Sequence, residues 1–299
     1  MKLGIAVVYL FGEQNEMLLD LHLSMIKKHT EVPYTIYGSV NRLQPEYTRR
    51  LQEHPEVRIC HCPETDLRRG KEHAFYLDHL IEIAVQDGAT HIVTLHLDSF
   101  PISTCWAGKL ADRLSPSCVF ATIDRINTAC LFFHREFYLQ YHPRLRLSVE
   151  ELASPQYKQY MQEWNPIQHS GIGYGFKAYS EGLSWHYLNP PAQLDDVNSF
   201  GIVYDDLVFH LRGATMVGEF PPPALGIMKG HSYSALLDKA LHGMKSVIPV
   251  RGQRFLRAHL PAPMEHFVDR PQAESRRSQL EQARQQLLED LEAIRGRYD

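Results

Sequence analysis

Asp98 is the residue whose position most favours chemistry, because it ends the apolar run His-Ile-Val-Thr-Leu-His-Leu-Asp at 91–98. Such a run is typical of a buried parallel strand. In open parallel sheets, ligands bind beyond the carboxyl ends of the strands. A carboxylate there can bind Mg²⁺ or Mn²⁺, with phosphate oxygens and water completing the coordination shell. The alternative is that Asp98 only caps the turn containing Ser99-Phe-Pro101.

A basic turn forms a second candidate site. Arg68, Arg69 and Lys71 flank Gly70 just before a predicted helix. Backbone N–H groups and the helix dipole favour anions at a helix N-terminus, so these residues are suited to binding phosphate. A solvated basic turn explains the same residues equally well.

The elements that must position these residues alternate between short apolar runs and amphipathic helical patterns, as in βαβ units. In the first half we predict strands at 3–10, 33–40, 57–62, 91–98 and 118–123, and helices at 15–29 and 71–86. The second half adds strands at 129–133, 185–188 and 202–211, a helix at 172–182, and loops with short helices over about 140–168. This order predicts an α/β fold with a mostly parallel central sheet flanked by helices.

The C-terminal segment has a different pattern. In 274–299, Leu280, Leu287, Leu291 and Ile294 recur at helical spacing among Arg, Gln and Glu. This pattern predicts an amphipathic helix. The helix packs back on its own domain or pairs with a second copy as a homodimer, and the pattern favours neither.

Composition excludes some classes of protein. Apolar types make up 44% and charged types 22% of the 299 residues, which is ordinary for a globular protein. The formal net charge of −4 argues against a nucleic-acid binder. No apolar run is long enough to be a transmembrane segment. The five cysteines, an odd number without an export signal, indicate a reducing compartment, so we expect a cytoplasmic protein.

The run from Gly70 through Pro101 resembles GT-A-fold nucleotide-sugar glycosyltransferases related to the large inverting family 2. In that group the donor-binding strand ends in an Asp-containing motif, often Asp-x-Asp, followed by a tryptophan. Asp98 and Trp106 match these positions, and the segment 129–138 resembles the following strand and its Arg-Glu-Phe stretch. The resemblance spans roughly residues 1–212.

The resemblance implies a GT-A, Rossmann-like catalytic domain over 1–215, with a donor half at about 1–125 and an acceptor half at about 126–215. Residues 216–273 would then be a C-terminal extension or lid, and 274–299 a helical extension.

The resemblance also implies roles for individual residues. Asp98 and His210 would hold the divalent metal, Mn²⁺ or Mg²⁺. Tyr9 and Asn41 match positions that bind the nucleotide base and ribose. Arg212 lies close enough in sequence to His210 to reach a diphosphate oxygen, and Arg68 and Lys71 would bind the donor. An alternative for His210 is a strand-end histidine with a local hydrogen bond.

Two positions depart from the family pattern. Residue 96 is His, so the motif reads His-Leu-Asp. Where the inverting family has an acidic pair, this chain has His169-Ser170-Gly171. His169 can serve as the base because an imidazole titrates near neutral pH. Asp195, Asp196 and Glu163 are the alternatives.

The predicted function is transfer of a hexosyl group from a nucleoside-diphosphate sugar to a hydroxyl acceptor on a glycan, a lipid-linked molecule or a protein. Whether the reaction inverts or retains configuration stays open. One alternative is a nucleotidyltransferase, although that class favours a glycine-rich basic loop after the first strand, and 11–16 is acidic here. The other is a catalytically degenerate GT-A domain that acts as a binding scaffold.

Overall fold

In a computed structural model of the chain, the described residues are 1–10, 17–67, 70–123, 126–164, 171–190 and 202–210. The predictions for 216–273 and 274–299, including the lid, the tail helix and its homodimer, lie outside these residues. In the described part, no helix is both long and apolar enough to cross a membrane.

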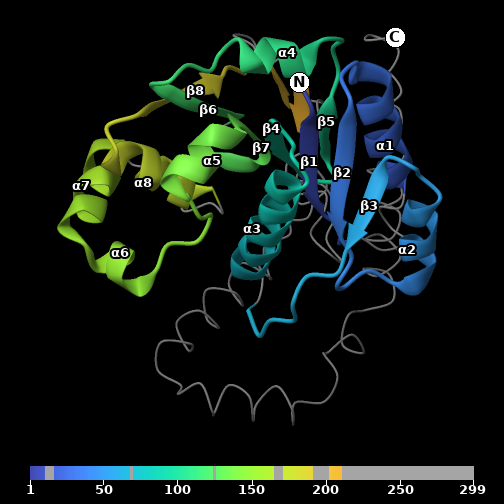
Figure 1. Cartoon of the computed structure of the whole chain (residues 1–299), viewed down its shortest axis with the longest axis horizontal. Coiled ribbons are helices and arrows are strands. Elements are labelled where there is room, and N and C mark those ends of the chain that lie inside the picture. Colours follow the sequence, from blue (N-terminus) through green and yellow to red (C-terminus); the bar gives the residue numbers. More distant parts are fainter. Residues whose placement is uncertain (11–16, 68–69, 124–125, 165–170, 191–201, 211–299) are drawn as a thin grey trace, which may run out of the picture. The chain divides into compact units, whose positions relative to one another are not determined.

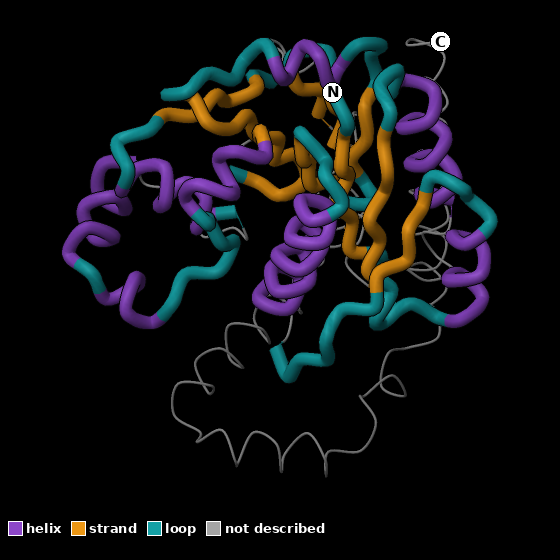
Figure 2. The backbone as a smooth tube through the Cα atoms, viewed as in Figure 1, coloured by secondary structure: helices purple, strands orange, loops and turns teal. Residues whose placement is uncertain are grey.

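The central sheet has seven strands in the order β3-β2-β1-β4-β7-β6-β8 (Figures 1 and 2). Its strands are β1 (Leu3–Val8), β2 (Tyr34–Ser39), β3 (Val57–Cys60), β4 (His91–Leu95), β6 (Cys118–Ile123), β7 (Asn127–His134) and β8 (Ser184–Leu188). The neighbours β3-β2-β1-β4 run parallel, as do β6 and β8, whereas β7 is antiparallel to both β4 and β6. The predicted α/β fold with a mostly parallel sheet is confirmed.

Helices connect and cover these strands. They are α1 (Met17–His29), α2 (Pro45–Gln52), α3 (Gly70–Gln86), α4 (Trp106–Ala111), α5 (Arg135–Tyr141), α6 (Val149–Ala153), α7 (Pro155–Trp164) and α8 (Ile172–Ser180). The sequence predicted α1, α3 and α8 to within a few residues, and the short helices α6 and α7 fall in the segment expected to contain them. Helices α2, α4 and α5 were not predicted, because each is too short to show a clear period.

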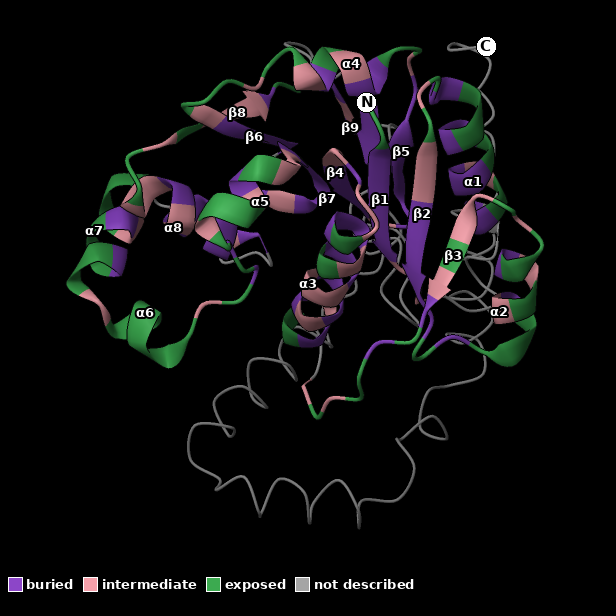
Figure 3. Cartoon of the chain, in the orientation of Figure 1, coloured by how far each residue is buried: buried purple, intermediate pink, exposed green. Residues whose placement is uncertain are grey.

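The core lies between α3 and the strands β1, β2 and β4. The predicted apolar face of α3 is buried, as Figure 3 shows for the helix and the sheet beside it. Gly4 on β1 permits close packing here, because a Cβ at this position would lie 3.0 Å from the Cβ of Ala84. The helix ends at Gln86 and is followed by Gly88, whose φ of 79° is the left-handed conformation expected just after a helix C-terminus.

A second, three-stranded sheet differs from the prediction. It contains β5 (Ser99–Pro101), β10 (Val208–His210) and β9 (Ile202–Tyr204) in that order. The single strand predicted at 202–211 was wrong, because the chain turns back at Asp205 and Asp206. Both residues have positive φ, 48° and 55°, and Asp tolerates this conformation better than most residues do. The turn has three residues, 205–207, and within it the backbone N–H of Leu207 donates to the carbonyl of Tyr204 at 2.9 Å.

Candidate metal site

The small sheet brings the two predicted metal ligands together. Strand β4 ends at Leu95, so Asp98 lies in the turn between β4 and β5 rather than in a strand. In the antiparallel pairing of β5 with β10, Ser99 is opposite His210. The rings of Phe100 and Phe209 pack at 5.1 Å between centroids and support this register. His210 therefore lies beside the residue that follows Asp98.

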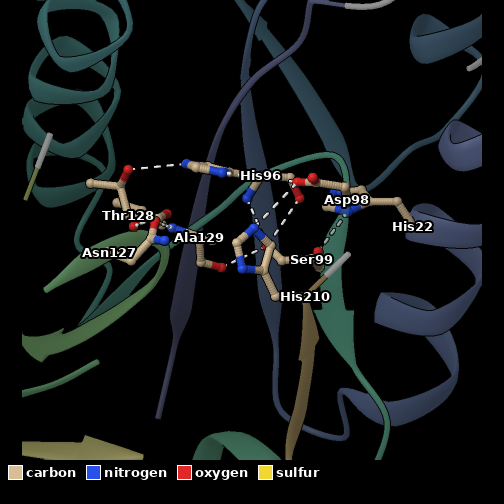
Figure 4. A network of polar contacts seen from close by, with 9 residues as sticks. His22, His96, Asp98, Ser99, Asn127, Thr128, Ala129 and His210 are labelled. Atoms are coloured by element: carbon tan, nitrogen blue, oxygen red, sulfur yellow. Dashed lines mark hydrogen bonds and ion pairs between the residues drawn. The ribbon is translucent and has the colours of Figure 1, made fainter. Parts of the chain in front are cut away.

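Asp98 and two histidines form a compact group (Figure 4). The Oδ1 atom of Asp98 lies 3.9 Å from Nδ1 of His96 and 3.9 Å from Nε2 of His210. One ligand atom from each residue lies within 4.8 Å of the others. The side chain of Asp98 is 0% exposed and that of His210 is 5% exposed, whereas His96 is 22% exposed. His96 is therefore the most accessible ligand of the group.

Hydrogen bonds hold the turn that carries Asp98. The hydroxyl of Ser99 donates to the carbonyl of Ala129 on β7 at 2.6 Å and accepts from the backbone N–H of His96 at 2.8 Å. The backbone N–H of Ser99 also donates to the carbonyl of His96 at 3.0 Å. On the helix side, Nδ1 of His22 is 3.0 Å from the carbonyl oxygen of Ser99. The turn is thus attached to β7 and to α1.

The ring of His96 is oriented by a neighbouring strand. Its Nε2 is 3.0 Å from the hydroxyl of Thr128, which leaves Nδ1 on the side of Asp98. The carbonyl of Thr128 accepts a hydrogen bond from the hydroxyl of Thr94 at 2.7 Å. Metal-binding histidines commonly use one ring nitrogen for the metal and the other for such a partner. The arrangement suits ligation through Nδ1 with the proton on Nε2.

Further imidazoles surround the group. The ring of His73 packs edge-on against His96 at 4.8 Å between centroids. Burial lowers the pKa of His73 to about 4 and that of His22 to about 4, the latter against a backbone hydrogen bond that raises it. Both rings are therefore neutral at pH 7.

The residues fit a divalent metal ion. A fully buried carboxylate is costly unless positive charge compensates it, and two imidazoles with one carboxylate are a common metal-binding set. His96, Asp98 and His210 would hold the ion. Among the described residues, these three form the group of His, Cys, Asp or Glu side chains whose ligand atoms lie close enough together to share one metal ion.

The predicted nucleotide-binding residues have internal contacts. Tyr9 is 1% exposed, and its ring fills the space beside Gly38, where a Cβ would lie 2.8 Å from Cε2 of Tyr9. Burial raises the pKa of Tyr9 above its usual range. The amide of Asn41 donates to the carbonyl of Cys62 at 2.6 Å and accepts from the hydroxyl of Ser39 at 2.9 Å. For both residues, nucleotide binding stays a prediction.

Other predicted residues are dispersed or not described. Lys71 is exposed in the first turn of α3, and Glu163 is exposed on α7, where its carboxylate accepts from Nε2 of Gln159 at 2.7 Å. Trp106 is fully buried, and its Nε1 donates to the hydroxyl of Thr30 at 3.1 Å. Outside the described residues lie Arg68, Arg69, His169, Asp195, Asp196 and Arg212.

His96 was not predicted to be a ligand, because it departs from the Asp-x-Asp pattern. An imidazole can nevertheless replace a carboxylate as a metal ligand. The signal was present in the position, because His96 occupies the first place of the Asp-x-Asp pattern. His22, His73 and Thr128 gave no such signal, since their proximity to Asp98 depends on the packing of α1, α3 and β7.

Comparisons with known proteins give only distant likenesses. No protein-family model matches the chain, and no curated protein matches it. Among solved structures, the apo form of mouse xyloside xylosyltransferase 1 has a TM-score of 0.40 and 11% identity, covering 63% of this chain and 86% of that one.

Two bacterial structures are similar at the same level. S. aureus TarS 1–349 in complex with UDP-GlcNAc has a TM-score of 0.38 and 7% identity, over 48% of each chain. The glycosyltransferase GlyE of Streptococcus pneumoniae TIGR4 has a TM-score of 0.36 and 10% identity, over 63% of this chain and 45% of that one. These TM-scores are too low to carry a functional assignment, which therefore depends on the site.

Proposed function

We propose that this protein is a metal-dependent glycosyltransferase that moves a sugar from a nucleoside-diphosphate donor to a hydroxyl group of a glycan, a lipid-linked molecule or a protein. The observation that carries the proposal is the convergence of His96, Asp98 and His210 just beyond the carboxyl end of β4. Sheets of this class bind their ligands at that edge. The GT-A resemblance of the run 70–101 points to the same place.

The triad of His96, Asp98 and His210 suits the leaving group of this reaction. When bound, a divalent ion supplies positive charge that offsets the negative charge developing on a departing nucleoside diphosphate. Asp98 and the two imidazoles would hold the ion in a buried position, where electrostatic interactions are stronger than in water. Lys71, at the first turn of α3, and the undescribed Arg68 and Arg212 are our candidates for binding the diphosphate oxygens.

Stereochemistry decides whether a catalytic base is needed. An inverting transfer requires a base that activates the acceptor hydroxyl for in-line attack. His169, Asp195 and Asp196 are candidates, and Glu163 is a fourth. A retaining transfer needs no base on that face, so the anomeric configuration of the product determines whether one of these residues has to act as a base.

The test is release of nucleoside diphosphate from a panel of nucleoside-diphosphate sugars that includes UDP-GlcNAc, with and without divalent ions. We expect ion-dependent release by the wild type and its loss in Asp98→Asn. The matched control is Asp112→Asn, an exposed aspartate at the end of α4. Circular dichroism of each variant checks that the fold is intact.

Other products would identify the alternatives. Release of pyrophosphate from a nucleoside triphosphate and a sugar phosphate indicates a nucleotidyltransferase. Ion-dependent donor binding without turnover, across the whole panel and with added acceptors, indicates a binding scaffold. Either result contradicts the proposed function.

A further inference from the structure

The metal-binding atoms of the triad differ from those that Mg²⁺ prefers. Two of the three ligands are imidazoles, and both approach Oδ1 of Asp98 at 3.9 Å. Mg²⁺ prefers an octahedral shell of oxygen ligands. Imidazole nitrogen instead suits Zn²⁺, Fe²⁺ and related transition ions, and affinity at such sites rises from Mn²⁺ through Fe²⁺ to Co²⁺.

We propose that His96 makes this site selective for a nitrogen-preferring transition ion, of the class of Co²⁺, Fe²⁺ or Zn²⁺, over Mn²⁺ and Mg²⁺. The role of that ion in sugar transfer rests on the proposed function. The selectivity itself is a property of the three side chains, and it is measurable without a donor.

The two imidazoles are held in place by the fold. His96 is fixed through Nε2 by Thr128 and is flanked by the ring of His73. His210 is 4% exposed, its backbone is fixed by the pairing with Ser99, and its ring packs edge-on against that of His96 at 5.8 Å between centroids. Rotating the ring of His96 away would break its contacts with Thr128 and His73. The nitrogen donors are therefore part of a prearranged site, and a metal that binds imidazole poorly gains little from them.

The charge of the site also follows from His96. With a single carboxylate and neutral imidazoles, the bound ion keeps part of its positive charge, whereas a second aspartate at position 96 would neutralise it. A diphosphate can then supply the missing negative charge and oxygen ligands. We therefore expect the ion and a nucleoside diphosphate to strengthen each other's binding, as reciprocal linkage requires.

The experiment is calorimetric titration of the full-length, metal-free protein with Co²⁺, Zn²⁺, Mn²⁺ and Mg²⁺ in the absence of any donor. His210→Ala supplies the baseline for ions bound elsewhere on this histidine-rich chain. We expect wild-type affinity for Co²⁺ to exceed that for Mn²⁺ by about tenfold or more, with Mg²⁺ weaker still. The visible absorption of bound Co²⁺ provides an independent signal of nitrogen ligation.

His96→Asp is the decisive variant. It should lower the ratio of Co²⁺ to Mg²⁺ affinity by about tenfold or more, because it replaces a nitrogen ligand by an oxygen ligand. It should also change the Co²⁺ spectrum. The matched control is His142→Asp, an exposed histidine with φ of 47° after α5, a conformation that Asp tolerates. It should leave both measurements unchanged.

Thr128→Val keeps all three ligands and covers the case in which His96→Asp does not fold. Loss of the hydrogen bond to Nε2 of His96 should weaken Co²⁺ binding by about 10- to 100-fold, the usual cost of removing such a partner. Equal wild-type affinity for Co²⁺ and Mg²⁺, or an unchanged affinity ratio in folded His96→Asp, would overturn the inference. Selective Co²⁺ binding without donor turnover would instead sustain it and count against the proposed function.

Discussion

His210 is the antiparallel partner of Ser99, the residue that follows Asp98. Strands β5 and β10 come from distant parts of the chain, and their pairing is what places an imidazole beside the buried carboxylate. The site is therefore only as well ordered as the β9–β10 hairpin. Residues of this hairpin that contact no metal ion should therefore affect metal binding.

Asp205 should be a positioning residue for His210. Its Oδ1 accepts from the backbone N–H of Asn189 at 3.0 Å, and its Oδ2 is 3.8 Å from both Arg113 and His186. We expect Asp205→Ala to reduce stability by about 1–3 kcal/mol and to weaken Co²⁺ binding, because it removes the hairpin's anchor. Urea denaturation and calorimetry measure the two effects.

Asp206→Ala is the control for this prediction. Asp206 is exposed and has a φ of 55°, close to that of Asp205, so alanine meets similar backbone strain at both positions. A metal affinity that falls equally in both variants would show that turn strain, and not the anchoring contacts, is responsible.

Metal binding should stabilise the wild type and not Asp98→Asn. An ion at about 100 times its dissociation constant adds about 2.7 kcal/mol to the free energy of unfolding. In EDTA, the same variant should be at least as stable as the wild type, because it removes a buried charge. Thermal melts in EDTA and in Co²⁺ give both comparisons. Equal Co²⁺ stabilisation of the two proteins would place the ion elsewhere.

The stability of the protein should depend on pH through Asp78 of α3. Burial raises the pKa of this carboxyl to about 7, although a hydrogen bond from the backbone N–H of Leu145, at 2.9 Å, favours its charged form. In the unfolded chain the group has its usual, lower pKa. The folded state therefore binds more protons between about pH 4 and pH 7, and this group's contribution to stability falls as pH rises through that window.

Asp78→Asn should remove that contribution while keeping an oxygen that can accept from Leu145. Urea midpoints at several pH values from 4 to 8 give the difference between variant and wild type. We expect the difference to shift in favour of the variant as pH rises and to level off above about pH 7. A difference that does not vary with pH would contradict this prediction.

Two glycines should respond oppositely to alanine. Gly38→Ala places a Cβ 2.8 Å from the buried ring of Tyr9, so we expect a loss of about 1–3 kcal/mol from overpacking. Gly108→Ala in α4 meets nothing within 4 Å, so we expect a gain of up to about 1 kcal/mol from helix propensity. Denaturant melts test both, and a neutral Gly38→Ala would show that Tyr9 can move aside.

The sequence by itself determined the elements with strong local patterns. The apolar run that ends near Asp98 predicted a buried strand, and the spacing of Ala74, Leu77 and Ile81 predicted the buried face of α3. Both are local signals, because burial on one face imposes a period that neighbouring residues display. The same run placed Asp98 at the carboxyl edge of the sheet.

Only the tertiary structure decided which side chains meet Asp98. Local periodicity carries no information about the pairing of β5 with β10, about the hairpin at Asp205, or about the contact of His96 with Thr128. These depend on the register between strands distant in the chain, which is set by packing of the whole domain. For this reason the sequence and its family resemblance indicated Asp98 and His210, and only the assembled fold showed that the imidazole of His96 lies beside them.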